Sequence, residues 1–394
     1  MNAPHGRIYL DNHATTRVDP RVVKAMLPFF SEIYGNAASA SHVFGVEARA
    51  AVDLARRRVA ALINADPADI VFTSGATESV NLALRGAVEA GAGRGNHVVT
   101  VATEHTAVLD TCRRLEEYGV RVSILPVDSE GLVDPDDVRK AISPKTLLVS
   151  VMAANNEIGT LADLGAVGAV CRERGVLLHT DAAQAAGKVA LDVRSLPVDL
   201  VSFTAHKMYG PKGAGALWLR GGVRVSSQML GGGHERGLRS GTLDVPGIVG
   251  FGAAAELALA EGPAESLRTE ALRDRLVEGL MARLDGVRLN GHPRRRLPNN
   301  ASLSFGGARA EAVIGAMRDI AVSTGSACSS AESRPSHVLS ALGLDRETVL
   351  STIRFGLGRF TTAEEIEAAV ERVAAAVRTA RSATPHLQHQ HIES

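Results

Sequence analysis

The chain has 394 residues, of which 45% are hydrophobic, so it can bury a large core and is too long for one simple domain. Lysine plus arginine and aspartate plus glutamate each number 43, which gives a formal net charge of zero, and aromatic residues make up only 4%. The absence of a basic excess and the shortage of stacking side chains argue against nucleic acid as a partner. We expect two domains, or one large domain with a smaller lobe.

The chain carries no obvious targeting signal. No apolar run reaches the roughly 18 residues that cross a bilayer, and residues 1–7 lead into a predicted strand without the apolar core of a signal peptide. We therefore expect no membrane association and a cytoplasmic location. The three cysteines, Cys112, Cys171 and Cys328, form neither a disulfide framework nor a zinc-binding Cys-x-x-Cys pair. Cys112 and Cys171 lie in helical patterns, where we expect small buried side chains.

Strands and helices alternate along the first two thirds of the chain. The apolar runs predict strands at 8–10, 70–73, 97–101, 120–125, 146–152, 176–180, 200–203 and 215–219. The helical patterns lie at 20–30, 42–63, 76–91, 106–118, 134–142 and 161–174. Such alternation of helices with apolar strands predicts an α/β fold, with a mostly parallel sheet covered by helices on both faces.

The last third has a different pattern, which predicts a smaller α+β lobe. A long helical stretch at about 244–284 leads into it. Strands are expected near 286–290, 300–305, 320–322 and 352–355, and helices near 309–317, 334–342 and 362–382. We predict a large domain at 8–258, whose first part (8–35) packs with the small domain, and a small domain at 259–381. Residues 323–336 are expected to form a mobile loop, and 382–394 a disordered tail.

Lys207 directly follows the apolar strand at 200–203 and precedes a Gly/Pro loop. In an open α/β sheet, ligands bind beyond the carboxyl ends of the strands. A partly desolvated lysine there loses proton affinity and can form a Schiff base with an aldehyde. The ordinary alternative is a solvated lysine on a surface turn. The other motifs must therefore decide whether Lys207 is a Schiff-base lysine.

Residues 73–79 (Thr-Ser-Gly-Ala-Thr-Glu-Ser) follow a strand and open a helix. Small residues and helix N-terminal N–H groups favour a phosphate there. The alternative is an ordinary helix cap, in which Ser74 or Thr77 serves the helix alone. No Gly-Lys-Ser/Thr follows, so the motif is not a Walker loop.

Asp181 and Gln184 follow the strand at 176–180. An acid at this place can pair with a protonated pyridine nitrogen and make the ring an electron sink, whereas the alternative is a helix-capping aspartate. The 26 positions from Asp181 to Lys207 amount to about one β-α-β step, so both stand along one crevice. An anion site, a ring-nitrogen acid and a Schiff-base lysine together describe pyridoxal phosphate.

Two further polar groups lie at predicted strand ends. His105 can stack on a pyridine ring and move protons near neutral pH, although a structural histidine is the alternative. The loop at 154–159 (Ala-Asn-Asn-Glu-Ile-Gly) carries amides that can hold a ring hydroxyl or a substrate carboxylate. By itself this loop is also an unremarkable turn.

Cys328 lies in a stretch of Gly, Ser and Ala with no bulky apolar residue, 323–333. We interpret the stretch as a mobile loop with an exposed thiol, which favours a nucleophile over an incidental cysteine. Arg354 lies in a short predicted strand of the small lobe. Its planar guanidinium suits an amino-acid carboxylate, and a surface ion pair is the alternative.

Together these motifs make the chain resemble the pyridoxal-phosphate-dependent cysteine desulfurases of the NifS/IscS type, class-V aminotransferases of fold-type I. The resemblance runs from Ile8 to the helix after Arg359. It is carried by the stretches 9–16, 72–79, 155–159, 202–213 and 231–242. Residues 323–328 (Ser-Thr-Gly-Ser-Ala-Cys) are similar to the cysteine loop of the long-loop class. The Arg-x-Gly-His-His pattern of the shorter-loop class does not occur.

The resemblance implies a role for each matching residue. Lys207 would form the Schiff base, Cys328 would be the nucleophile, and His105 would stack on the ring. The cofactor contacts that it implies are Ala76, Thr77, Thr204 and His206 at the phosphate, Asp181 at the ring nitrogen, and Gln184 and Asn156 at the ring oxygen. Thr242 would complete the phosphate site of the other subunit of a homodimer, and Arg354 with Asn156 would bind the substrate carboxylate.

The implied reaction removes sulfur from L-cysteine, giving L-alanine and a persulfide on Cys328. The sulfur would pass to an acceptor such as an iron–sulfur scaffold protein, where Cys328 would transiently touch the nascent cluster. Two alternatives remain open. One is another fold-type I enzyme, such as a selenocysteine lyase or an aminotransferase. The other is a catalytically weak scaffold or sulfur-carrier protein, which would show no cofactor absorbance.

Overall fold

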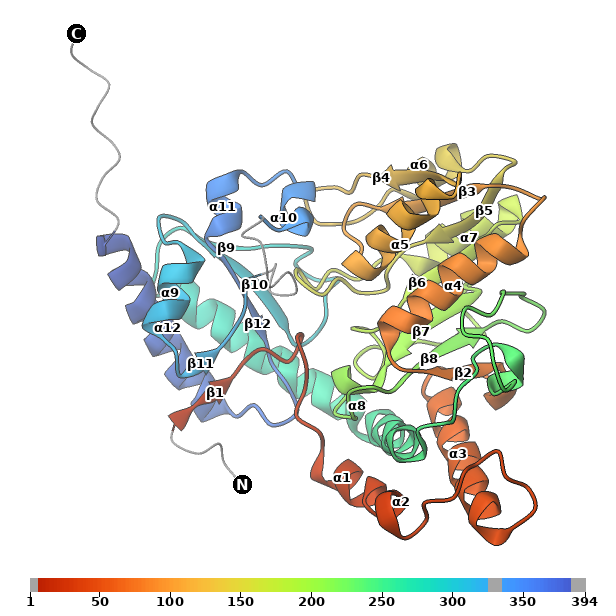
Figure 1. Ribbon diagram of the computed structural model, residues 1–394. Coiled ribbons are helices and arrows are strands. Elements are labelled where there is room, and N and C mark those ends of the chain that lie inside the picture. Colours follow the sequence, from red (N-terminus) through yellow and green to blue (C-terminus); the bar gives the residue numbers. More distant parts are fainter. Residues whose placement is uncertain (1–5, 325–334, 384–394) are drawn as a thin grey trace.

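The computed structural model describes residues 6–324 and 335–383, which form two lobes joined by a long helix (Figure 1). The large lobe contains a seven-stranded sheet of order β2-β8-β7-β6-β5-β3-β4. Its strands are β2 (Ile70–Thr73), β3 (His97–Val101), β4 (Arg121–Leu125), β5 (Thr146–Ser150), β6 (Leu177–Asp181), β7 (Leu200–Thr204) and β8 (Gly215–Leu219). Only β8 runs against its neighbours in this sheet, so the predicted mostly parallel α/β sheet is confirmed.

Both faces of this sheet are buried under helices, which explains why its strands are continuous apolar runs. Ile70 and Phe72 of β2 face one core and Val71 faces the other, because side chains alternate along a strand. The first core lies under α3, α6, α7 and α8, and the second under α4 and α5. These helices are α3 (Val43–Leu62), α4 (Ala76–Ala90), α5 (Thr106–Glu117), α6 (Pro135–Ala141), α7 (Leu164–Arg174) and α8 (Val245–Met281).

Helix α8 belongs to both lobes. Asp244 caps its first turn, and its 37 residues run from the large core, around Phe251, to the small core, around Leu276. The predicted domain boundary at 258/259 falls inside this one helix. Among the described residues, α8 alone is long and apolar enough to cross a membrane, but 67% of its most apolar window is buried within the fold.

The small lobe contains a three-stranded antiparallel sheet of order β12-β10-β9 and its own core. Its elements are β9 (Val287–Leu289), β10 (Asn300–Phe305), α9 (Ala310–Ala316), β11 (Ile320–Ala321), α10 (His337–Ala341), α11 (Arg346–Leu350), β12 (Thr352–Gly356) and α12 (Ala363–Ala383). The first strand of the chain, β1 (Ile8–Tyr9), pairs in parallel with β11 of this lobe. Helix α11 was absent from the predicted elements.

The expected helix at 20–30 is interrupted. The structure has α1 (Pro20–Met26) and α2 (Pro28–Ser31), with Leu27 between them. Proline at 28 has no N–H to continue the ladder, and it is well suited to open a new helix. Both short helices lie against α8. The N-terminal segment therefore starts in the small lobe and then crosses to the large one.

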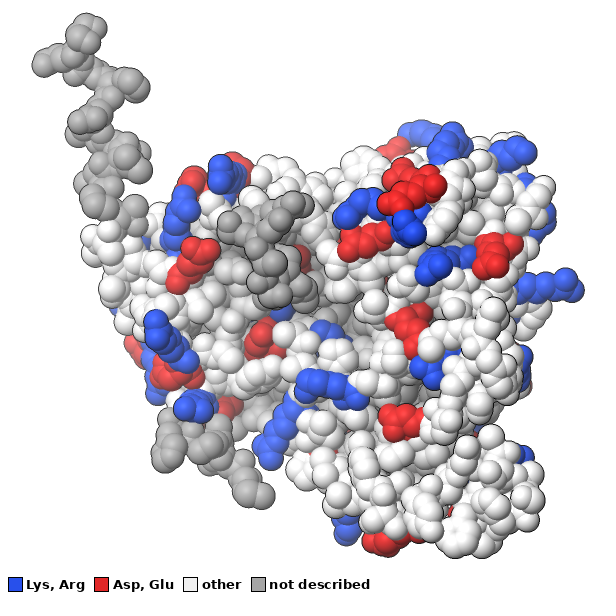
Figure 2. Space-filling model, in the orientation of Figure 1, with Lys and Arg blue, Asp and Glu red and all other residues white. Residues whose placement is uncertain are grey.

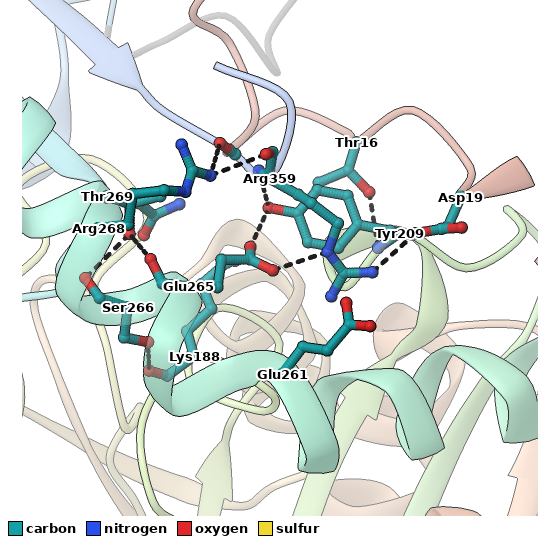
Figure 3. A network of polar contacts seen from close by, with 12 residues as sticks. Thr16, Asp19, Lys188, Tyr209, Glu261, Glu265, Ser266, Arg268, Thr269 and Arg359 are labelled. Carbon is teal, nitrogen blue, oxygen red and sulfur yellow. Dashed lines mark hydrogen bonds and ion pairs between the residues drawn. The ribbon is translucent and has the colours of Figure 1, made fainter. Parts of the chain in front are cut away.

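A buried polar network ties this segment to α8 and to both lobes (Figure 3). The Arg359 guanidinium donates to Asp19 Oδ2 at 2.9 Å and to Glu265 Oε2 at 2.7 Å. The Tyr209 hydroxyl donates to Glu265 Oε1 at 2.6 Å and accepts from the Arg359 N–H at 2.6 Å. Tyr209 has a left-handed backbone, φ 64°, and its N–H donates to Thr16 Oγ1 at 2.8 Å. The network fixes the position of the lobes around the chain that follows β7.

We expect Arg359→Met to lower the free energy of unfolding by about 3–5 kcal/mol, because it leaves the largely buried Glu265 carboxylate without its paired arginine. It also removes one of the two arginines that pair with Asp19, which keeps Arg21. The Arg359 and Asp19 side chains are only 11% and 2% exposed. The measurement is urea denaturation. Arg275→Met is the matched control, since its pair with Glu367 is more than half exposed, and we expect a change of about 0–1 kcal/mol there. Equal losses in the two variants would refute the structural role of the network.

Candidate active site

A cavity of about 450 Å³ opens at the carboxyl ends of the parallel strands, where the N-terminal segment and the small lobe close over the sheet. Ten of the residues predicted from the sequence line it: Ala76, Thr77, His105, Asn156, Asp181, Gln184, Thr204, His206, Lys207 and Arg354. Thr242 is exposed and does not line this cavity. Cys328 lies outside the described residues.

Lys207 ends a short 3₁₀ helix, Ala205–Lys207, that directly follows β7. Its ammonium group donates to the backbone carbonyl of His13, and to that of Ala14 at 2.7 Å. Lys207 is half-buried, so it is not the solvated surface lysine that the Gly/Pro loop alone would suggest. Its Nζ lies between the strand end and the N-terminal segment, and Lys207 lines the cavity.

The N-terminus of α4 borders the cavity with its backbone N–H groups at Ala76 and Thr77. The cap is Gly75, and no side chain caps this end of the helix, so the alternative of Ser74 or Thr77 as an ordinary cap is wrong. First-turn N–H groups that no side chain caps attract an anion. The Glu78 carboxylate nearby accepts from the Ser74 N–H and pairs with Arg239 at 2.8 Å, which offsets its negative charge.

Two buried carboxyl groups, Asp181 and Glu104, lie near each other, and of the two Asp181 lines the cavity. Asp181 ends β6, is 5% exposed, and accepts from the Ala183 N–H at 2.8 Å. Turns follow it, so it caps no helix. Glu104 is fully buried, and neither of its oxygens has a side-chain partner among the described residues. Burial raises the pKa of Asp181, and burial together with the charge of Asp181 raises the pKa of Glu104 well above its usual value. A cationic ligand atom beside Asp181 would stabilise its ionised form.

His105 has both a structural contact and a place in the cavity wall. It is the N-cap of α5, and its Nδ1 accepts from the Ala107 N–H at 3.1 Å. In the neutral ring the proton therefore sits on Nε2.

The side-chain amide of Asn155 makes all its hydrogen bonds within its own region of the fold. It donates to the Thr103 carbonyl and accepts from the N–H groups of Glu157 and Ile158. This leaves Asn156 to line the cavity.

Arg354 of β12 brings a cation from the small lobe to the cavity wall. Its side chain is 3% exposed, so it is not a surface ion pair. Nη1 donates to the Asn156 carbonyl at 2.9 Å and Nη2 to Asp11 Oδ1 at 3.0 Å. The buried Nε has no partner among the described residues. A guanidinium in the wall of this cavity suits a carboxylate ligand.

Sequence reasoning did not select His13, Lys188 and Glu157, which also belong to the site. His13 lines the cavity and contacts Gln184, a residue 171 positions away. Burial and the charge of Lys207 lower the pKa of Lys188 to about 7. Glu157 is 4% exposed and accepts from the Ser336 hydroxyl, and burial raises its pKa to about 7. All three lie within or near the motifs, but only the long-range packing shows their neighbours: His13 lies near Lys188, and Glu157 near Arg354.

The residues fit pyridoxal phosphate. The uncapped N–H groups of α4 suit its phosphate, the buried Asp181 suits a protonated ring nitrogen, and Lys207 suits its aldehyde. Among residues 6–324 and 335–383 there is no cluster of three or more histidine, cysteine, aspartate or glutamate side chains that could hold a metal ion.

Comparison with known proteins agrees with this site. Residues 8–369 match the family described as aminotransferase class-V. The cysteine desulfurase IscS of an Anaeromyxobacter species is 53% identical over 380 residues, covering 96% of this chain and 94% of that protein. The enzyme of the same name from Methylococcus capsulatus is also 53% identical, with the same coverage. Among solved structures, a NifS-like protein has a TM-score of 0.89 at 39% identity, covering 95% of this chain and 100% of that one. SspA in complex with cysteine has a TM-score of 0.81 at 34% identity, covering 90% of this chain and 100% of that one.

Glu157 gives a pH-dependent prediction. A carboxyl group whose pKa is raised in the folded state contributes stability below its unfolded value, and this contribution is lost as pH rises through the folded value. We therefore expect the free energy of unfolding of the wild type, relative to Glu157→Gln, to fall between about pH 4.5 and pH 7. Chemical denaturation at pH 5 and pH 8 measures the difference, and Glu130→Gln, which changes an exposed carboxylate, is the control. A pH-independent difference would contradict the assignment.

Proposed function

The chain belongs to the aminotransferase class-V family and is a pyridoxal-phosphate-dependent cysteine desulfurase, and we propose that Lys207, His105 and Cys328 are its catalytic residues. The observation that supports the assignment of Lys207 is the convergence, in one cavity, of Lys207, the uncapped end of α4, Asp181 and Arg354. These are the groups needed for an aldehyde, a phosphate, a ring nitrogen and an amino-acid carboxylate. When bound, the cofactor supplies an electron sink for cleavage at the substrate's carbon atoms.

The chain's own groups would bind and orient the substrate. Arg354 and Asn156 hold the carboxylate of L-cysteine, and the fixed position of Arg354 orients the rest of the molecule. Lys207 moves protons to and from the substrate carbons. His105, protonated on Nε2 in its neutral form, would hold the cofactor ring and donate a proton. Ala76, Thr77, Thr204 and His206 hold the phosphate, and Gln184 holds the ring oxygen.

Cys328 would receive the sulfur. Its thiolate forms a bond to the substrate sulfur as the carbon–sulfur bond breaks, which leaves a persulfide and, after protonation of the carbon, L-alanine. The described residues that flank its segment support this role, because both flanks are attached to the cavity wall. Ser323 pairs with the Arg354 backbone, its carbonyl accepting at 2.7 Å, and Ser336 donates to Glu157.

We expect Cys328→Ser to keep the yellow absorbance of the bound cofactor and to lose at least a hundredfold of its sulfide and alanine release from L-cysteine, since a hydroxyl cannot accept the sulfur. Both products and the absorbance spectrum are measured. Cys112→Ala is the control. Burial raises the pKa of Cys112 to about 12, so this thiol is not ionised near neutral pH, and activity should persist.

Either of two results would overturn the assignment. Full activity in Cys328→Ser would make that cysteine incidental and would favour another fold-type I enzyme. A wild type without cofactor absorbance or turnover would favour a scaffold or carrier protein.

We further propose a homodimer in which Thr242 completes the partner's phosphate site. The support is a set of large apolar side chains that are 52–66% exposed on α2, on α3 and beside them: Leu27, Phe30, Tyr34, Val43 and Val46. This end of the molecule is largely without charged side chains in Figure 2. An exposed apolar patch of this kind marks an interaction surface. Thr242 is also exposed, and its loop is held beside α4 by the Arg239–Glu78 pair.

The dimer proposal predicts that Phe30→Asp combined with Tyr34→Asp gives a monomer in sedimentation experiments, because two charges would be buried at the interface. Leu267→Asp is the control, since that side chain is 70% exposed on α8, far along the helix from the patch. Thr242→Ala should remain dimeric but bind the cofactor about tenfold or more weakly, through loss of a hydrogen bond to a charged group. A monomeric wild type, or unchanged cofactor affinity in Thr242→Ala, would refute the shared site.

The proposal also covers the protein that accepts the sulfur and the cellular location of the enzyme. We propose an iron–sulfur scaffold protein as acceptor, with transient contact between Cys328 and the nascent cluster. The name IscS shared by the relatives supports this. A cytoplasmic location is supported by Cys112 and Cys171, which are buried free thiols.

A further inference from the structure

Three contacts determine which nitrogen of His13 carries a proton. The Gln184 amide nitrogen donates to the His13 carbonyl at 2.9 Å, and Lys188 Nζ donates to Gln184 Oε1 at 3.4 Å. Both contacts place the oxygen of that amide toward His13 Nδ1, which lies 3.0 Å away. An amide oxygen only accepts, so Nδ1 must be the donor.

The His13 ring is neutral, which leaves its second nitrogen as an acceptor. Burial, with the charges of Lys188, Arg354 and Lys207, holds the pKa of His13 well below its usual value. With the proton on Nδ1, Nε2 carries a lone pair. This atom is buried and has no hydrogen-bond partner among the described residues. A buried acceptor without a partner is unfavourable by about 1–3 kcal/mol, so a donor is expected.

His13 lies between Lys207 and strand β12, which carries Arg354. The His13 carbonyl accepts from Lys207 Nζ, the nitrogen that the substrate's amino group must replace. On the other side the ring packs against Gly356, where an added Cβ would lie 2.7 Å from His13 Cδ2. Gly356 and Arg354 are two residues apart on β12 and face the same side of the strand.

An unpartnered donor, Arg354 Nε, and an unpartnered acceptor, His13 Nε2, thus lie in the same region of the described structure. An α-amino acid carries an acceptor and a donor on one carbon, namely its carboxylate and its ammonium group. We propose that His13 Nε2 accepts a hydrogen bond from the α-ammonium group of the substrate as it enters the cavity. This inference rests on the proposed function and adds His13 to its substrate-binding residues.

The test measures binding rather than turnover. In the holoenzyme whose lysine–cofactor Schiff base has been reduced with borohydride, ligands bind without reacting. Calorimetric titrations would compare L-alanine (ammonium and carboxylate), propionate (carboxylate only) and 3-mercaptopropionate (thiol and carboxylate). His13→Asn keeps a donor toward Gln184 and lacks Nε2. It should weaken L-alanine about tenfold to a hundredfold and leave the other two ligands within twofold.

His13→Gln is the matched rescue, because its longer amide carries an oxygen to the place of Nε2, and it should recover most of the L-alanine affinity. Should His13→Asn lose the cofactor, His13→Ser provides the same comparison between ligands. The inference is overturned by equal losses for L-alanine and propionate, by no loss for L-alanine, or by a loss confined to 3-mercaptopropionate. L-cysteine turnover by the unreduced wild type is measured alongside, so failure of the proposed function is recognised separately.

Discussion

The site depends on the contact between the Lys207 ammonium and the backbone carbonyls of His13 and Ala14. These carbonyls belong to a segment that begins in the small lobe, where β1 pairs with β11, and reaches the large lobe at α1. The sheet alone would present Lys207 on an open edge. The crossing segment covers that edge, and the Arg359 network fixes the segment and the two lobes in the arrangement that the cavity needs.

The cavity gathers charges that the described chain does not fully neutralise. Asp181, Lys207 and Arg354 line it, and the buried Glu104 and Lys188 lie close enough to feel the charges of Asp181 and Lys207. Burial shifts the pKa of each carboxyl group upward and that of Lys188 downward, so burial alone favours their neutral forms. A ligand that brings a ring cation to Asp181 and anions to α4 and Arg354 reverses these preferences. Its own charges are thus part of what makes the site stable.

The sequence was most informative where local pattern decides the structure. Strands β3, β8 and β10 have the predicted ends, because β3 and β8 are short, mostly apolar runs and β10 alternates polar with apolar residues. The strand-end motifs indicated Lys207, Asp181 and the end of α4 because parallel strands place their carboxyl ends along one edge. The contact of His13 with Gln184, by contrast, joins residues far apart in the chain. No periodicity encodes such a contact, whereas the long helix that joins the lobes, predicted at about 244–284, follows from local pattern alone.

The close packing of Gly356 on His13 also limits how this sequence can change during evolution. At 2.7 Å from the imidazole, and 2.9 Å from the His13 backbone nitrogen, an added methyl group has no space. A smaller residue at position 13 would remove the clash with the side chain, but the clash with the backbone nitrogen would remain. This packing therefore favours glycine at position 356 for most residues at 13, because the backbone contact does not depend on the side chain there, and it restricts position 13 to side chains that fit against a strand residue without a Cβ. The two positions form an unequal pair, in which the strand residue restricts the turn residue's options.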